Sequence, residues 1–160
     1  MQLKGSCHCQ AVRFTLESKH PCPYNLCYCS ICRKTNGSGG FGINLGGAFD
    51  TLRVEGEEHI SVYRARIPTD DGLKESSCER RFCKQCGSGL WVWAPEWPQL
   101  VHPFASAIDT ELPMPPEYTH LMLGSKATWV RVHAGPRDKQ FEQYPDESLA
   151  AWHTRLGIEG

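Results

Sequence analysis

The sequence predicts a mainly β, single-domain protein, stapled by zinc, with a short helix near its C-terminus. Three observations predict this class. A chain of 160 residues is long enough for one hydrophobic core and too short for two comfortable ones. Short apolar runs rich in β-branched and aromatic residues recur along it, and glycine or proline turns separate them. Seven of the nine cysteines form three tight groups, a spacing typical of thiolates that share a metal ion.

The strands are predicted from side-chain alternation and from their boundaries. At residues 11–16, Val12, Phe14 and Leu16 alternate with polar neighbours, as in a half-buried strand. Glycine pairs such as those at 39–40 and 46–47 mark turns between later runs. Further strands are expected at residues 41–45, 59–63, 90–93, 120–123 and 128–132. We interpret the five tryptophans as core and pocket wall.

Two segments depart from the strand pattern. Three prolines lie between residues 113 and 116, so residues 109–119 are predicted to form a surface loop. Near the end, Asp146 offers a helix cap, Leu149, Trp152 and Leu156 recur at helical spacing, and Gly157 supplies a stop. We predict that residues 1–135, which contain all nine cysteines, form a zinc-binding domain. Residues 136–160 would form an extension of the same domain that carries a short helix.

The composition limits the partners of the protein. Hydrophobic residues make up 40%, charged residues 22%, and the formal net charge is -1, which leaves no concentrated basic surface for nucleic acid. The first residues lack an apolar signal core, and no stretch reaches the roughly 18 apolar residues of a membrane span. We predict a cytoplasmic protein with no nucleic-acid or membrane partner. In a reducing compartment its thiols persist as metal ligands.

The segment 83–87 has the form of a zinc knuckle. Cys83 and Cys86 bracket a tight turn, and a glycine follows. A knuckle supplies two ligands and needs a second pair. Cys7 and Cys9, beside the first predicted strand, can provide it. An ordinary zinc-ribbon pattern would instead join the knuckle to the two-residue spacing of 29–32, and the spacings leave that choice open.

A second metal site is predicted at Cys27, Cys29 and Cys32. Three thiolates can hold a zinc ion but leave its fourth position to water or to a substrate thiolate. An open zinc ion acts as a Lewis acid that favours deprotonation of a bound thiol. A thioredoxin-like redox role for these cysteines is a weaker interpretation, because the βαβ context that it requires is missing.

Three motifs together resemble the glutathione-dependent formaldehyde-activating enzyme family, which also includes centromere protein V. They are GSCHC at 5–9, CYCSICRK at 27–34 and RFCKQCG at 81–87, and the resemblance runs from about Gly5 through Trp129. It implies a β-rich, tent-like fold that binds two zinc ions. Carried over by position, the structural zinc ligands are Cys7, Cys9, Cys83 and Cys86, and the catalytic zinc ligands are Cys27, Cys29 and Cys32.

The resemblance also implies an activity. The founding reaction of the family joins formaldehyde to glutathione and gives S-hydroxymethylglutathione, and the family is classed with carbon-sulfur lyases. Our leading hypothesis is a zinc-dependent carbon-sulfur lyase that acts on small thiol adducts. Arg33 and Lys34 could attract the carboxylates of glutathione. The alternatives are a non-catalytic, zinc-stapled binding module and a metal-free thiol redox protein. Cys22 and Cys78, outside the groups, are interpreted as ordinary free thiols.

Overall fold

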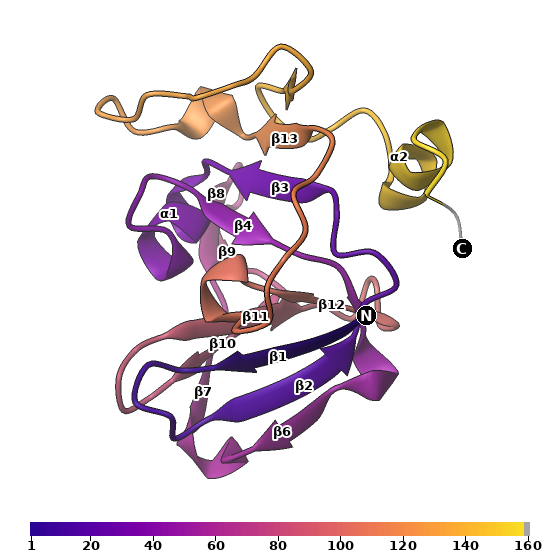
Figure 1. The fold of residues 1–160 in the computed structure, drawn as a ribbon. Helices are drawn as coiled ribbons and strands as arrows, with labels where there is room; N and C mark the ends of the chain where they lie inside the picture. The colour runs from indigo at the N-terminus through magenta and orange to yellow at the C-terminus, as the bar shows by residue number, and fades with distance from the viewer. Residues whose placement is uncertain (159–160) are drawn as a thin grey trace.

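The computed structural model describes residues 1–158, in which short strands form four small sheets (Figure 1). The first sheet has three antiparallel strands in the order β1-β2-β6. These strands are β1 (Gln2–Ser6), β2 (Arg13–Glu17) and β6 (Arg53–Glu55). The predicted alternation at residues 11–16 is confirmed, because Val12, Phe14 and Leu16 are all buried.

The second sheet has five antiparallel strands in the order β5-β12-β11-β10-β7. They are β5 (Gly47–Ala48), β12 (Leu100–Pro103), β11 (Gly89–Trp93), β10 (Glu79–Cys83) and β7 (Ile60–Tyr63). The first two sheets meet in the core, where the rings of Phe14 and Trp91 pack edge to face with centroids 5.0 Å apart. Strand β10 matters for function because it ends at a cysteine of the knuckle.

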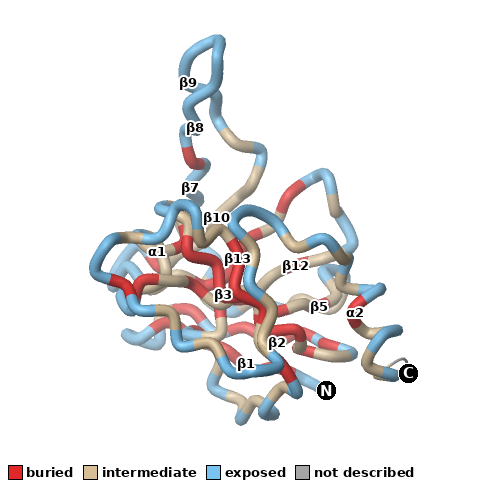
Figure 2. Tube along the Cα trace, turned by 90° about the horizontal axis from the view of Figure 1, so that it is seen from above, coloured by how far each residue is buried: buried red, intermediate tan, exposed pale blue. Residues whose placement is uncertain are grey.

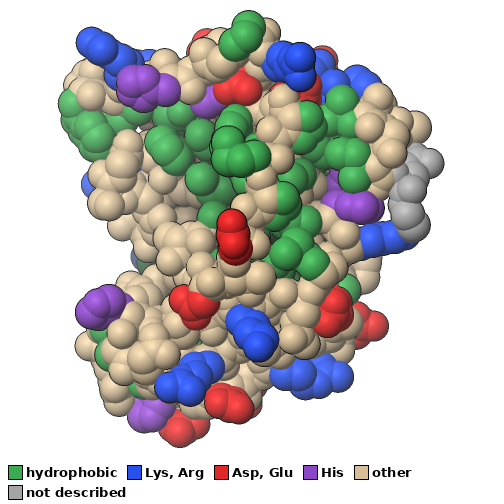
Figure 3. Space-filling view, in the orientation of Figure 1, with side chains coloured by type: hydrophobic (Ala, Val, Ile, Leu, Met, Phe, Trp, Pro, Cys, Tyr) green, Lys and Arg blue, Asp and Glu red, His purple; other side chains and the backbone are tan. Residues whose placement is uncertain are grey.

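The third sheet contains parallel pairs, with the order β14-β13-β3-β4. Its strands are β14 (Lys139–Gln140), β13 (Tyr118–Leu121), β3 (Tyr24–Cys27) and β4 (Gly42–Asn44). The helix α1 (Ser30–Asn36) joins β3 to β4. In the orientation of Figure 1, apolar side chains gather over the β3–β13 half of the molecule, whereas charged side chains are spread over the β1-β2-β6 half (Figure 3).

The fourth sheet is a hairpin of β8 (Arg66–Thr69) and β9 (Gly72–Glu75). Every residue of both strands is exposed, and Figure 2 shows the hairpin projecting from the body of the protein. It corresponds to a polar stretch of the sequence without an apolar face. The hairpin therefore adds no side chain to the core.

The helix predicted near the C-terminus is confirmed as α2 (Leu149–Arg155). Its cap is Ser148 instead of Asp146, since the Ser148 hydroxyl accepts a hydrogen bond from the backbone N–H of Ala151 at 3.1 Å. Trp152 is 1% exposed and joins the helix to the loop before β13. Both α-helices have seven residues, and none in the described part of the chain is long and apolar enough to cross a membrane.

The strand predicted at residues 128–132 is wrong. The backbone N–H of Val130 donates to the carbonyl of Ala127 at 3.1 Å, so the segment closes a turn instead of pairing with a neighbouring strand. Trp129 is 64% exposed and does not belong to the core. The predicted strand at 120–123 ends early, at Leu121, because Met122 has a positive φ of 59° that extended backbone does not allow.

Candidate metal centres

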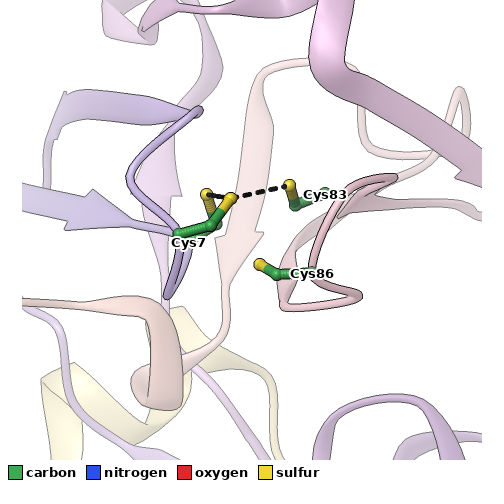
Figure 4. A group of neighbouring side chains, drawn as sticks. Cys7, Cys83 and Cys86 are labelled. Atoms are coloured by element: carbon green, nitrogen blue, oxygen red, sulfur yellow. Dashed lines mark hydrogen bonds between the residues drawn. The ribbon is translucent and has the colours of Figure 1, made fainter.

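The four-cysteine cluster (Cys7, Cys9, Cys83, Cys86) joins the turn after β1 to the knuckle after β10. All four sulfurs lie within 4.8 Å of one another. The Sγ of Cys9 is 3.6 Å from that of Cys7 and 3.7 Å from that of Cys83, and Figure 4 shows the side chains pointing toward a common centre. The zinc-ribbon alternative, which joined the knuckle to residues 29–32, is therefore excluded by the structure.

Backbone conformation holds these sulfurs in place. The N–H of Val12 donates to Cys7 Sγ at 3.2 Å. In the knuckle, Gly87 adopts a φ of 78°, and its N–H donates to the carbonyl of Cys83 at 2.7 Å, which closes the turn. Glycine adopts this left-handed conformation at low cost, which explains the glycine that follows the knuckle in the sequence. The hydroxyl of Ser88 lies 3.2 Å from Cys86 Sγ and is the main reason that the pKa of this thiol falls to about 5.

The three-cysteine cluster (Cys27, Cys29, Cys32) lies at the junction of β3 and α1. Cys27 ends β3, Cys29 caps the helix and Cys32 lies within it. The Sγ of Cys29 accepts the backbone N–H of Cys32 at 3.3 Å. Cys27 and Cys32 are buried, and within residues 1–158 no fourth cysteine, histidine or carboxylate joins the group.

The three thiols of this cluster differ in how readily they lose a proton, because the pKa of Cys29 is lowered and those of Cys27 and Cys32 are raised. Hydrogen bonds from the thiols of Cys27 and Cys32 lower the pKa of Cys29 far below its ordinary value. Hydrogen bonds with Cys29 and Cys32, together with burial, raise the pKa of Cys27. The first thiolate of the cluster therefore forms at Cys29, where backbone N–H groups also stabilise it.

Two side chains from other strands donate to Cys32. Arg80 on β10 places Nη2 3.6 Å from Cys32 Sγ, and Asn44 on β4 places Nδ2 3.9 Å from the same sulfur. The hydrogen bond with Cys27 and the charge of Arg80 lower the pKa of Cys32, but the hydrogen bond with Cys29 and burial raise it, and the net shift is upward. Sequence reasoning missed both residues, because they lie 48 and 12 positions from Cys32 and follow no motif spacing.

The donor sets fit a thiophilic divalent metal ion. Four thiolates can close a tetrahedral shell, whereas three leave one place for a ligand from outside the protein. His8, which stands between Cys7 and Cys9, is exposed and belongs to neither group. In both clusters, cysteine can thus supply all of the protein ligands to a metal ion.

Comparison with known proteins identifies the family. Residues 2–125 match the family model described as glutathione-dependent formaldehyde-activating enzyme. The chain belongs to this family. A curated protein of Halomonas elongata, named "Putative glutathione-dependent formaldehyde-activating enzyme", is 60% identical over 159 residues, which cover 99% of each chain. A crystal structure of a Rhodobacter sphaeroides protein has a TM-score of 0.53 at 24% identity, over 69% of this chain and 91% of that one. That likeness concerns the fold alone.

Arg33 and Lys34, the residues predicted to attract glutathione, lie on α1 directly after Cys32. Both line a cavity of about 550 Å³ that also reaches Cys7 and Asp109. The Nε of Arg33 is buried and has no hydrogen-bond partner among residues 1–158. In this member of the formaldehyde-activating family the basic pair therefore borders a polar cavity that extends from α1 to the four-cysteine cluster.

A buried polar chain lies behind the three-cysteine cluster. The Tyr28 hydroxyl is 2.9 Å from His120 Nδ1, and His120 Nε2 is 3.0 Å from Asp138 Oδ2. The backbone N–H groups of Tyr118 and Gly135 each donate to Asp138 at 2.9 Å. Burial raises the pKa of Asp138, but these hydrogen bonds more than offset burial, so the net pKa is lowered. Tyr28, which lies between Cys27 and Cys29 in the sequence, is thus buried and held by a hydrogen bond with His120.

Two further residues, Tyr144 and Cys78, lie near the three-cysteine cluster, whereas Cys22 lies apart from it. Tyr144, in the segment before α2, has its pKa raised by partial desolvation and by nearby thiolates, chiefly those of Cys27 and Cys29. Cys78 is a free thiol just before β10, and Cys22 lines a separate cavity beside α2. The sequence could not predict that Tyr144 lies near the cluster. The fold brings it there, because residue 143 is hydrogen-bonded to Met122, directly after β13.

Proposed function

We propose that the protein is a zinc-dependent carbon-sulfur lyase that joins glutathione and formaldehyde to give S-hydroxymethylglutathione. One observation carries the proposal: in a member of the formaldehyde-activating family, three thiols converge without a fourth protein ligand among residues 1–158. The four-cysteine cluster would hold the structural zinc ion, and the three-cysteine cluster the catalytic one. When bound there, zinc supplies positive charge that favours the thiolate form of a substrate thiol.

The protein's own residues would prepare the site for this chemistry. Cys29 ionises first, and Arg80 and Asn44 each place a donor next to Cys32 Sγ, where they would stabilise its thiolate once a cation is bound. The substrate thiol loses its proton to solvent, and its sulfur then attacks the aldehyde carbon. The C–S bond forms while the C=O π electrons move to oxygen, which takes up a proton. The reverse direction breaks the same C–S bond.

Arg33 and Lys34 would bind the carboxylates of glutathione in the cavity that they line. The unmatched Nε of Arg33 supports this assignment, because a buried guanidinium donor without a partner is costly unless a ligand meets it. The planar guanidinium can hold a carboxylate through two parallel hydrogen bonds. The substrate class is therefore a small thiol that carries carboxylates, of which glutathione is the one suggested by the family.

We also propose that the protein acts in the cytoplasm and folds as one unit. All nine cysteines are free thiols, as a reducing compartment maintains them. Residues 1–135 would form the zinc-binding domain, with 136–160 as an integral extension. The pairing of β14 with β13 and the burial of Trp152 support this division, since both tie the extension to the earlier part of the chain.

Metal content and turnover test the proposal together. The purified protein should hold about two zinc ions, and Cys32→Ser should remove one while the far-UV circular dichroism stays unchanged. Formaldehyde consumption should require both glutathione and metal, and Cys32→Ser should abolish it. Cys22→Ser, a free cysteine outside both clusters, is the matched control and should keep zinc content and rate.

Two results would contradict the proposal. Equal formaldehyde consumption with glutathione, without it and in a metal-free control would discard the formaldehyde chemistry. Unfolding of Cys32→Ser would favour the alternative of a non-catalytic, zinc-stapled binding module, because the second zinc would then be structural.

A further inference from the structure

Arg80 has donors that the protein leaves unused. Its Nη2 donates to Cys32 Sγ at 3.6 Å, whereas Nε and Nη1 are buried and have no hydrogen-bond partner among residues 1–158. A guanidinium group has five N–H donors, and leaving buried donors unmet costs free energy. The neighbouring arginines differ: Arg64 and Arg81 both bind the carboxylate of Glu79, at 2.7 and 2.9 Å.

The strand geometry explains why Arg80 receives no carboxylate from the protein. Side chains alternate along β10, so Glu79 and Arg81 share one face and Arg80 points to the other. Glu79 is thus committed on the face away from Cys32. The unused donors of Arg80 are held beside the three-cysteine cluster, and no acceptor among residues 1–158 meets them.

The surroundings of Arg80 suit a small anionic ligand. Arg80 lines a groove of about 360 Å³ whose other walls are mainly apolar. The groove opens beside Val62 and Tyr63, which are 41% and 45% exposed. Apolar walls exclude water and strengthen the attraction between a guanidinium and an anion. Arg81, whose Nη1 is bound to Glu79, also lines the groove, and the remaining wall residues are Thr35, Val62, Tyr63, Phe82, Gly87, Gly89 and Phe104.

We propose that Arg80 binds the anionic oxygen of a substrate whose sulfur lies at the three-cysteine cluster. The inference rests on the proposed function and adds a residue and a substrate feature to it. When the substrate sulfur attacks the aldehyde, the electron pair of the C=O π bond moves to oxygen. That oxygen is attached to the carbon bonded to sulfur, so a group already in contact with Cys32 Sγ can reach it. Arg80 would hold the alkoxide until it takes up a proton.

Equilibrium binding of two probes tests this role without turnover. Mercaptoacetate carries a carboxylate on the carbon attached to sulfur, and methyl mercaptoacetate is its neutral counterpart. By titration calorimetry, the zinc-loaded protein should bind mercaptoacetate at least about tenfold more tightly than the ester, the size expected of a charge-assisted hydrogen bond. Arg80→Met should reduce this ratio to about one.

Two further variants serve as controls for the binding experiment. Arg64→Met removes a neighbouring cation that does not contact the cluster, and it should keep the wild-type ratio. Arg80→Lys keeps a cation and most of the stem, so it guards against a folding defect. It should lower the ratio, because an ammonium lacks the fixed fork of donors. In the turnover assay, Arg80→Met should lower kcat about 10- to 100-fold with little change in KM for glutathione.

The outcomes separate this inference from the proposed function. Discrimination between the probes that depends on Arg80, without any turnover of formaldehyde, would overturn the proposed function and leave the anion site. Turnover of formaldehyde with equal affinity for both probes would overturn the anion site and leave the function. Loss of one zinc ion from Arg80→Met would also overturn it, since Arg80 would then support the thiolates and not the substrate.

Discussion

The imidazole of His102 is tied to Leu45 by a hydrogen bond of 2.8 Å between Nδ1 and the carbonyl oxygen. A carbonyl can only accept, so Nδ1 carries the proton. The N–H of Leu45 also donates to the carbonyl of Pro103 at 2.9 Å, and the two contacts fasten the residue after β4 to β12. The ring of His102 packs edge to face on Trp97, with centroids 4.7 Å apart. A histidine in this setting is held in its neutral form.

This setting predicts how stability depends on pH. Burial lowers the pKa of His102 below its ordinary value of 6.5, and the Leu45 hydrogen bond opposes burial only in part. Below pH 6.5 the unfolded chain binds a proton that the folded chain does not, so stability is complete above that pH and falls as the pH decreases. The loss has a limit of about 1.4 kcal/mol per pH unit. Urea unfolding of the wild type and of His102→Gln between pH 7.5 and 5.5 should show a smaller loss in the variant.

The control for this prediction is His133→Gln, which removes an exposed histidine. It should keep the wild-type dependence on pH. If His102→Gln and the wild type lost stability in parallel over this range, His102 would not be the group that titrates.

A second prediction concerns Asp138, the acceptor of three hydrogen bonds behind the three-cysteine cluster. Asp138→Asn replaces one carboxylate oxygen by an amide donor and leaves a buried N–H group unmatched. The free energy of unfolding at pH 7 should fall by about 1–3 kcal/mol. Urea denaturation measures it, and Asp70→Asn in the exposed hairpin should change it by less than about 0.5 kcal/mol. Equal effects of the two substitutions would show that the buried chain adds nothing to stability.

The cap of α2 gives a third prediction. Ser148→Ala removes the hydroxyl that accepts the N–H of Ala151, so it should lower the free energy of unfolding by about 1 kcal/mol. Asp146→Ala, at the position that the sequence suggested as the cap, should change it by less than about 0.5 kcal/mol. Thermal unfolding of both variants in the same buffer is the measurement. A larger effect of Asp146→Ala would mean that the helix begins earlier than the structure shows.

A fourth prediction distinguishes two possible costs of a side chain at Gly87, a steric clash and an unfavourable backbone conformation. A methyl group added at Gly87 would have no heavy atom within 4 Å, so a clash cannot be the penalty. Its φ of 78° remains, and a left-handed conformation costs an alanine about 1–2 kcal/mol. Gly87→Ala should therefore lower stability by about that amount and speed the release of one metal ion to a chelator. Gly39→Ala, also in open space but without a positive φ, should behave like the wild type.

The parts of the fold that were predicted correctly have local signals. Val12, Phe14 and Leu16 alternate on one strand, and Leu149 and Trp152 share one helix face, so each pattern is complete within a few residues. The missed parts lack such signals. In the helix α1 only Cys32 is buried, so no apolar face marks it, and its cap is Cys29, which is not among the usual capping residues.

The candidate site also has parts that the sequence predicts and parts that only the fold reveals. The cysteine spacings indicate the type of ligand, but only the fold shows that the knuckle meets Cys7 and Cys9. Arg80 and Asn44 reach Cys32 from different sheets, so no pattern along the chain connects them. The exposed turn at Trp129 could not be predicted either, because its residues favour a strand wherever a partner strand is present.

The distribution of the cysteines along the chain has a consequence for biosynthesis. All three sulfurs of one centre have left the ribosome once Cys32 emerges, whereas the other centre still lacks two of its sulfurs until Cys83 and Cys86 follow, some fifty residues later. Translation proceeds from the N-terminus at about 5–20 residues per second. A nascent chain thus presents all three sulfurs of the three-cysteine cluster for several seconds before the four-cysteine cluster can assemble.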